Sequence, residues 1–166
     1  MNFVDEQVRI FCITIFIFDY ALSIVSCFKI ISFQYKNECY KLFKGQFIMI
    51  ANILIAVIAL LHIWFLILEM FLWDKPIGMK TFGNNPEKAQ LTKVLAQNQG
   101  LYNGFLAAGL IWSLCATAPF ATQLANFFLG CVLVAGLYGA MTASKKILYI
   151  QALPALIALL VVNFLA

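Results

Sequence analysis

Long apolar blocks separated by short polar connections are the feature that most constrains how this chain folds. Four such blocks follow Gln46, over about residues 47–73, 100–116, 124–143 and 147–166. A helix needs about 20 mostly apolar residues to cross the hydrocarbon of a bilayer. The blocks therefore predict an all-α fold, a polytopic transmembrane helix bundle with four core spans.

The composition favours a membrane protein over a soluble one. Of the 166 residues, 64% are hydrophobic and 11% are charged, against roughly 45–50% and about 25% in soluble domains. The net charge of +4 does not indicate nucleic-acid binding, because no basic stretch is interleaved with aromatic residues. We therefore expect the lipid bilayer, and no nucleic acid, as a partner of the chain.

Lysines in two of the connections predict the topology. They are Lys75, Lys80, Lys88 and Lys93 in the connection over residues 74–99, and Lys145 and Lys146 in the connection over residues 144–146. In an up-down bundle these two loops lie on the same side, and lysine-bearing loops of membrane proteins are typically cytoplasmic. The pattern predicts a multi-pass protein of the cell membrane with both loops in the cytoplasm, and with Met49 and Ala166 facing outward.

Local signals divide the polar connection over residues 74–99. Gly78, Gly83 and the Asn84–Pro86 run are typical of turns. Asn85 has the character of a helix N-cap, with Pro86 at the first helical position. We expect a short amphipathic helix over Glu87–Ala96 that lies near the membrane surface and leads into the second span.

The first 46 residues do not fit the four-span pattern, so we treat them as an extension of the domain over residues 47–166. Their apolar segment, residues 10–31, is long enough to be a fifth span, but Asp19 lies in its middle. The lysines that follow it would then face outward, against the charge rule. A signal peptide is not favoured either, because Asp5 and Glu6 stand where such peptides carry positive charge.

A third hypothesis for this extension is that translation begins at Met49. Lys44 and Gly45 can be encoded by a ribosome-binding sequence, and three codons separate them from Met49. The upstream residues are rich in Ile, Phe, Lys and Tyr, as translated AT-rich DNA would be. Under this hypothesis residues 1–48 do not belong to the native protein.

Several stretches resemble a family of small bacterial integral membrane proteins catalogued as domain of unknown function 1304. The longest is Asn98–Trp112 (NQGLYNGFLAAGLIW). The others are Leu68–Trp73, Lys80–Gly83, Phe128–Gly130, Val134–Gly139, Ser144–Lys146 and Gln151–Pro154. The resemblance extends in order from about Met49 to the C-terminus. It implies a four-helix membrane protein and supplies no activity.

Polar side chains gather at the predicted cytoplasmic ends of the spans. Glu69 is a carboxylate within a membrane helix, which is a functional-site hypothesis by default, and His62 lies seven residues earlier on nearly the same face. The candidate polar cluster consists of Glu69, His62, Asn98, Gln99, Tyr102, Asn103, Tyr138 and Gln151. Such a cluster is either a structural hydrogen-bond network or a polar pocket centred on Glu69 and open to the cytoplasm.

Small residues recur at the spacing of one helical turn in the second and third spans. Gly100 and Gly104 are four residues apart, and Ala135 and Gly139 belong to a small-residue stripe on the third span. Such stripes permit close approach of helices. We interpret these four residues as helix-packing positions, within one bundle or between copies in a homo-oligomer.

No catalytic motif appears in the sequence. The five cysteines form no CxxC pair, and the single histidine excludes multi-histidine metal or haem ligation. We therefore predict no cofactor and no metal site, and we favour a non-enzymatic protein that binds or passes a small molecule, or that serves as an interacting subunit.

Two alternatives remain open at this point. One is a small membrane enzyme acting on a lipophilic or thiol substrate. The chain bears a faint resemblance to the membrane-associated eicosanoid and glutathione metabolism proteins, but the spacing of Asn98 and Asn103 differs and the expected arginines are missing. The other alternative is a purely structural or assembly role for the small-residue stripes.

Overall fold

Every regular element between residues 3 and 165 is helical, which confirms the predicted all-α fold. The computed structural model describes the backbone of residues 3–165, together with the side chains of Lys29 and of residues 33–164. The apolar N-terminal segment over residues 10–31 belongs to the first helix. The side chain of Asp19 lies outside the described residues.

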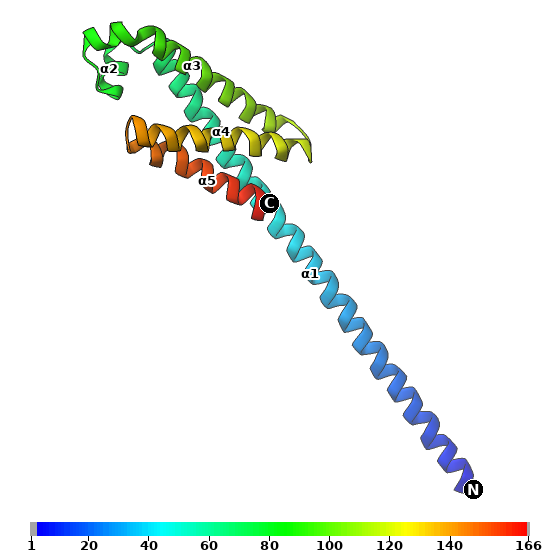
Figure 1. Ribbon diagram of the computed structural model, residues 1–166. Helices are drawn as coiled ribbons and strands as arrows, with labels where there is room; N and C mark the ends of the chain where they lie inside the picture. The colour runs from blue at the N-terminus through cyan, green and yellow to red at the C-terminus, as the bar shows by residue number, and fades with distance from the viewer. Residues whose placement is uncertain (1–2, 166) are drawn as a thin grey trace. The chain divides into compact units, whose positions relative to one another are not determined.

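The elements follow one another along the chain with short connections. They are α1 (Phe3–Met70), α2 (Pro76–Phe82), α3 (Pro86–Cys115), α4 (Phe120–Thr142), the π-helical turn η1 (Leu148–Ala152), α5 (Leu153–Leu160) and the π-helical turn η2 (Val161–Leu165) (Figure 1). The chain divides into two compact units, Met1–Lys44 and Gly45–Ala166.

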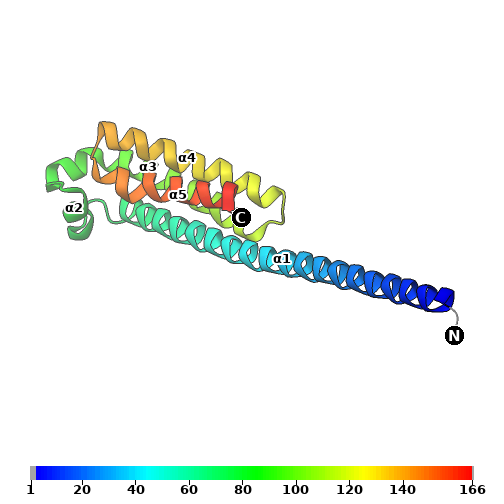
Figure 2. The same cartoon turned by 90° about the horizontal axis from the view of Figure 1, so that it is seen from below.

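The second unit is an up-down arrangement of the C-terminal part of α1, α3, α4 and the helical segment that contains α5. Figures 1 and 2 show α3, α4 and α5 side by side, with neighbours running in opposite directions. The hydrophobic core that these three helices share with the C-terminal part of α1 consists of Ile55, Ile58, Ala59, Leu110, Ala125, Leu129, Val132, Ala155 and Ala158. Burial of these apolar side chains is the main packing contribution within the unit.

The two lysine-bearing loops lie at the same end of this unit. The connection that contains α2 and the connection between α4 and η1 are neighbours at that end in Figure 1. This placement follows from the alternating direction of the four helices. It agrees with the expectation that the two loops share a side.

Residues 87–96 are helical, as predicted, but the prediction of a short helix there is wrong, because helix α3 is continuous from Pro86 to Cys115. The predicted start is confirmed, because the Asn85 side chain accepts a hydrogen bond of 2.8 Å from the backbone N–H of Lys88. No proline occurs between Pro86, at the start of the helix, and Pro119, which follows its end. The sequence therefore contains no signal that would end the helix between the amphipathic segment and the predicted span.

The loop after α1 holds a helix that the sequence signals missed. α1 ends at Met70, three residues before the predicted boundary at Trp73. α2 then begins at Pro76, and Gly83 caps it in the left-handed conformation with φ of +66°. Gly78 lies buried inside α2 and not in a turn. The position requires glycine, because a Cβ there would collide with the carbonyl oxygen of Leu72.

The C-terminal helical segment changes its winding beside Pro154. A proline within a helix lacks the N–H donor, and its ring collides with the carbonyl four residues earlier. The π-helical turn η1 ends at Ala152, two residues before Pro154, and widens the backbone there. The segment can thus continue through the proline, as the sequence predicts.

Within residues 33–164, two helical segments are long and apolar enough to cross a membrane, namely Phe33–Met70 and α4. The segment Leu148–Phe164 is apolar but shorter. α3 is long enough to cross a membrane, but it is less apolar because it contains amides such as Asn98, Gln99 and Asn103. Length and apolar character thus single out two of the four predicted spans.

Candidate functional site

Glu69 lies where the last turn of α1 meets the middle of α3. One of its carboxylate oxygens accepts a hydrogen bond of 2.7 Å from the side-chain amide of Asn103. The same amide nitrogen lies 3.2 Å from the backbone oxygen of Gln99, which accepts a second bond. The carboxylate is half-buried. It has no ion-pair partner among residues 33–164.

Two glycines of α3 allow the close approach of α1 at this site. A Cβ on Gly100 would lie 2.6 Å from the Cγ of Met70 and 3.1 Å from the Cβ of Glu69. A Cβ on Gly104 would lie 2.6 Å from a methyl carbon of Leu66. The absence of side chains at these two positions therefore brings Asn103 within reach of Glu69.

Gln97 belongs to the same contact, although the sequence reasoning did not select it. Its side-chain amide donates to the backbone oxygen of Met70 over 3.5 Å. The last four carbonyls of a helix lack a partner within the helix, and α1 ends at Met70. The position of Gln97, one turn before Gly100, was the signal that could have revealed this contact.

His62 forms a second polar pair with Gln151. The ring is fully buried. Its Nδ1 lies 2.8 Å from the backbone oxygen of Ile58, and its Nε2 lies 3.4 Å from the side-chain nitrogen of Gln151. A carbonyl oxygen only accepts hydrogen bonds, so Nδ1 carries the proton and Nε2 accepts from the Gln151 amide. Both ring nitrogens are therefore satisfied.

The predicted cluster thus contains two separate pairs, Glu69–Asn103 and His62–Gln151, with no hydrogen bond between them in the described part of the chain. The side chains of Asn98, Gln99 and Tyr102 are exposed on α3, and Tyr138 is exposed on α4. Burial and hydrogen bonding therefore concentrate on four of the eight candidate residues.

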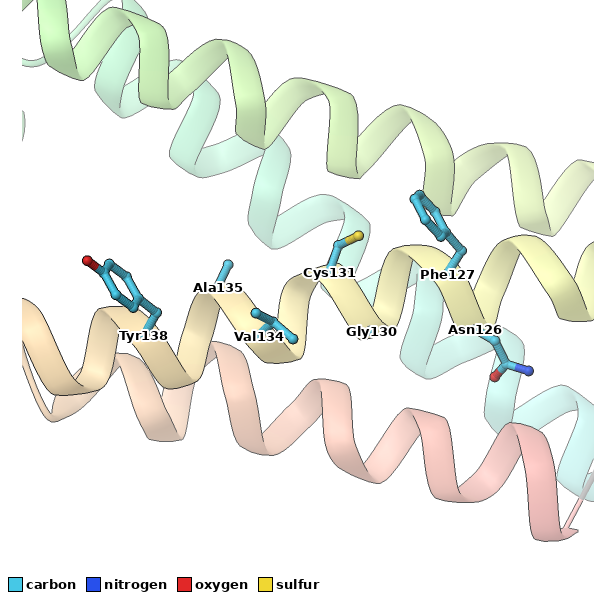
Figure 3. A pocket seen from close by; sticks show the side chains of 7 residues that line it. All are labelled: Asn126, Phe127, Gly130, Cys131, Val134, Ala135 and Tyr138. Carbon is cyan, nitrogen blue, oxygen red and sulfur yellow. The ribbon is translucent and has the colours of Figure 1, made fainter.

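An open groove runs along α4 and contains none of Glu69, Asn103, His62 and Gln151. Its lining consists of Asn126, Phe127, Gly130, Cys131, Val134, Ala135 and Tyr138 (Figure 3). Ala135 lies in this groove, whereas the neighbouring Gly136 and Gly139 contact Ala152 and Ile147. The groove is largely apolar and offers no acid–base or nucleophilic arrangement.

Asn126 and Asn163 form a third polar pair, which the sequence reasoning missed. Each side-chain amide donates to the oxygen of the other, over 3.0 Å and 2.7 Å, and this joins α4 to η2. Antiparallel neighbours place the beginning of one helix beside the end of the next. Two asparagines at such positions were the available signal.

The loop that contains α2 is fixed by contacts of its own. The indole N–H of Trp73 donates to the hydroxyl of Thr92 over 3.1 Å. The centroid of the Trp73 ring lies 4.7 Å from that of the Phe82 ring. Lys93 forms an ion pair of 2.8 Å with Asp74. The described residues contain no group of three His, Cys, Asp or Glu side chains that could hold a metal ion.

The Asp74–Lys93 ion pair leads to a pH prediction. The hydrogen bond from Lys93 lowers the pKa of Asp74 below its usual value. The pair therefore stabilises the fold above the unfolded-state pKa of about 3.9, and this contribution is lost as the pH falls through the lower folded-state pKa. We expect Lys93→Met to lower the thermal midpoint at pH 7 and to have little effect at pH 2. A difference that is equal at both pH values would contradict this assignment.

Comparison with known proteins gives the chain a family. The family described as "Protein of unknown function (DUF1304)" matches residues 56–163. The uncharacterised protein YpaA of Lactococcus lactis subsp. lactis (strain IL1403) is 29% identical over 110 residues, which cover 65% of this chain and 92% of that protein. No solved structure matches the chain. The match over residues 56–163 shows that this chain belongs to the DUF1304 family of proteins of unknown function.

Proposed function

We propose that this chain is a four-span integral membrane protein that binds a small positively charged molecule at Glu69. The two long apolar helical segments and the apolar segment Leu148–Phe164 support a membrane location. The lysine-bearing loops share one end, and that end would be cytoplasmic by the charge rule. α3 supplies the fourth span, and two of its amides, Gln97 and Asn103, donate hydrogen bonds to α1.

The observation that carries the proposal is the environment of Glu69. Its carboxylate is half-buried between two helices, and its hydrogen-bond donor is the neutral amide of Asn103. A charged group within a membrane is costly unless another charge compensates it. Among residues 33–164 no lysine or arginine forms an ion pair with Glu69. A bound cation would supply the missing charge.

The close helix contacts give less support to an assembly role. Gly100 and Gly104 pack against α1, and Gly136 packs against Ala152 of the same chain. These positions are therefore occupied within the bundle. The open groove on α4, with Ala135, remains the surface that a second copy could use.

Substitution of Glu69 by glutamine tests the proposal. Glutamine has nearly the same shape and can still accept from Asn103, so the variant should fold and lose only the negative charge. Glu87→Gln is the matched control, because Glu87 is an exposed acid at the start of α3. The chain, purified in mild detergent, is heated with a series of alkylammonium ions from methylammonium to tetrabutylammonium.

At least one ion of the series should stabilise the native chain and the Glu87→Gln variant, but not the Glu69→Gln variant. An ion at a hundred times its dissociation constant stabilises the folded state by about 2.7 kcal/mol. Native mass spectrometry should show the same ion as an adduct. Equal stabilisation of the Glu69→Gln variant would overturn the proposal, as would the absence of stabilisation by every ion of the series.

A further inference from the structure

The loop after α1 and the first turns of α3 carry lysines on their outer side. We call this region, residues 71–97, the basic end surface. It contains four lysines and two acids. Asp74 and Lys93 neutralise each other. The remaining lysines, Lys75, Lys80 and Lys88, are exposed and form no ion pair within residues 33–164.

Large apolar side chains are exposed beside these lysines. Leu91 is 79% exposed, and Val94 and Leu95 lie on the same outer side of α3. Ala89 and Ala96 form the opposite, buried side of these turns. Exposed apolar side chains next to lysines are typical of protein segments that lie in the headgroup region of a membrane.

The apolar side of these turns continues along the rest of α3. Leu101 follows Val94 by seven residues and Phe105 follows Leu101 by four, which places the three on one face of the helix, and all are exposed. In the four-span arrangement this side of α3 faces lipid. The basic end surface is therefore continuous with a lipid-facing strip and does not form a separate patch.

The tryptophan contacts hold the lysine-bearing turn in a fixed position. Trp73 bonds to Thr92 and packs against Phe82, so the loop and α2 are tied to α3. Gly78 lets α2 approach the backbone of Leu72. Tryptophan is itself enriched at membrane interfaces. Lys75 and Lys80 are thus carried by a small, well-packed structure.

We propose that the basic end surface binds the headgroups of anionic phospholipids. The ammonium groups of Lys75, Lys80 and Lys88 would contact lipid phosphates, while the apolar side chains of α3 lie among the adjoining acyl chains. This inference rests on the membrane location proposed above. An acidic protein partner fits less well, because it would have to cover an apolar strip that continues into the lipid-facing side of α3.

Fluorescence quenching by brominated lipids tests the inference on the full chain. Trp64 and Trp112 are exposed, so Trp64→Phe with Trp112→Phe leaves Trp73 as the single reporter. This protein is reconstituted into vesicles of brominated phosphatidylcholine mixed with plain or brominated phosphatidylglycerol. One lysine near an anionic surface is worth about a fivefold preference. We therefore expect Trp73 to select phosphatidylglycerol about fivefold or more, with the preference weakened by salt.

A triple variant and a matched control assign the preference to these lysines. Replacing Lys75, Lys80 and Lys88 by glutamine should reduce the selection to about equal quenching by the two lipids. The control replaces Lys36, Lys41 and Lys44 by glutamine, which removes the same charge from the other unit. This control should keep the preference of the native chain.

The outcomes separate this inference from the membrane proposal. Equal quenching of the native reporter by both lipids would overturn the inference alone, and retention on immobilised polyglutamate would then assign the surface to an acidic protein partner. A preference that persists in the Lys75, Lys80, Lys88 variant would also overturn it. Failure of the protein to associate with either kind of vesicle would overturn the membrane location as well.

Discussion

Replacing Gly136 by alanine is expected to destabilise the folded unit by about 1–3 kcal/mol, the usual cost of overfilling a close-packed contact. A Cβ at this position would lie 2.7 Å from the backbone nitrogen of Ala152 and 3.0 Å from its Cα. Backbone atoms cannot move away by a rotamer change, as the end of a flexible side chain can. The whole helical turn η1 would have to shift away from α4, so the thermal midpoint in detergent should fall.

Gly130→Ala is the control, since it makes the same chemical change on the same helix. A Cβ at Gly130 would meet no atom within 4 Å. Alanine favours the helix over glycine by about 1 kcal/mol, so this variant should equal or exceed the native chain in stability. If both variants unfold at the native temperature, then α4 and η1 do not approach as closely as described.

Replacing Gln151 by leucine should have the second-largest effect, a loss of about 1–3 kcal/mol of folding free energy. The Nε2 of His62 would lose its donor at a fully buried position. A buried acceptor without a partner costs more than the hydrogen bond itself contributes. The midpoint of thermal unfolding in detergent, compared with that of the native chain, measures the loss.

The double variant His62→Phe with Gln151→Leu distinguishes this cause from a packing defect. It removes the buried acceptor together with its donor, so most of the stability lost in Gln151→Leu should return. Double-mutant analysis isolates the coupling between the two side chains. Additive losses from the two substitutions would show that the hydrogen bond contributes nothing to stability.

Parts of the bundle could be predicted because they depend on local pattern and length. The apolar blocks indicated the helices, and Asn85–Pro86 indicated the start of α3. The same signals failed at Gly78, because glycine suits a turn by its own preferences. Only the approach of α2 to the backbone of Leu72 shows why glycine is needed there.

The candidate site divides in the same way. Its polar residues could be identified one by one, since amides and carboxylates in apolar helices are rare and costly. Their pairing could not, because it depends on how far each helix slides and rotates against its neighbour. Asn103 reaches Glu69 only because Gly100 and Gly104 let α1 approach, whereas Tyr102, one residue earlier, faces outward.

By itself the sequence determined the helical class, the four apolar blocks and the end of the molecule that carries the lysines. These features follow from hydrophobicity, charge and capping, which act over a few neighbouring residues. The tertiary structure alone decided that His62 pairs with Gln151 and Asn126 with Asn163. These partners lie far apart in the sequence, and the packing of the helices brings them together. Close contacts such as that between Gly136 and Ala152 set how the helices pack.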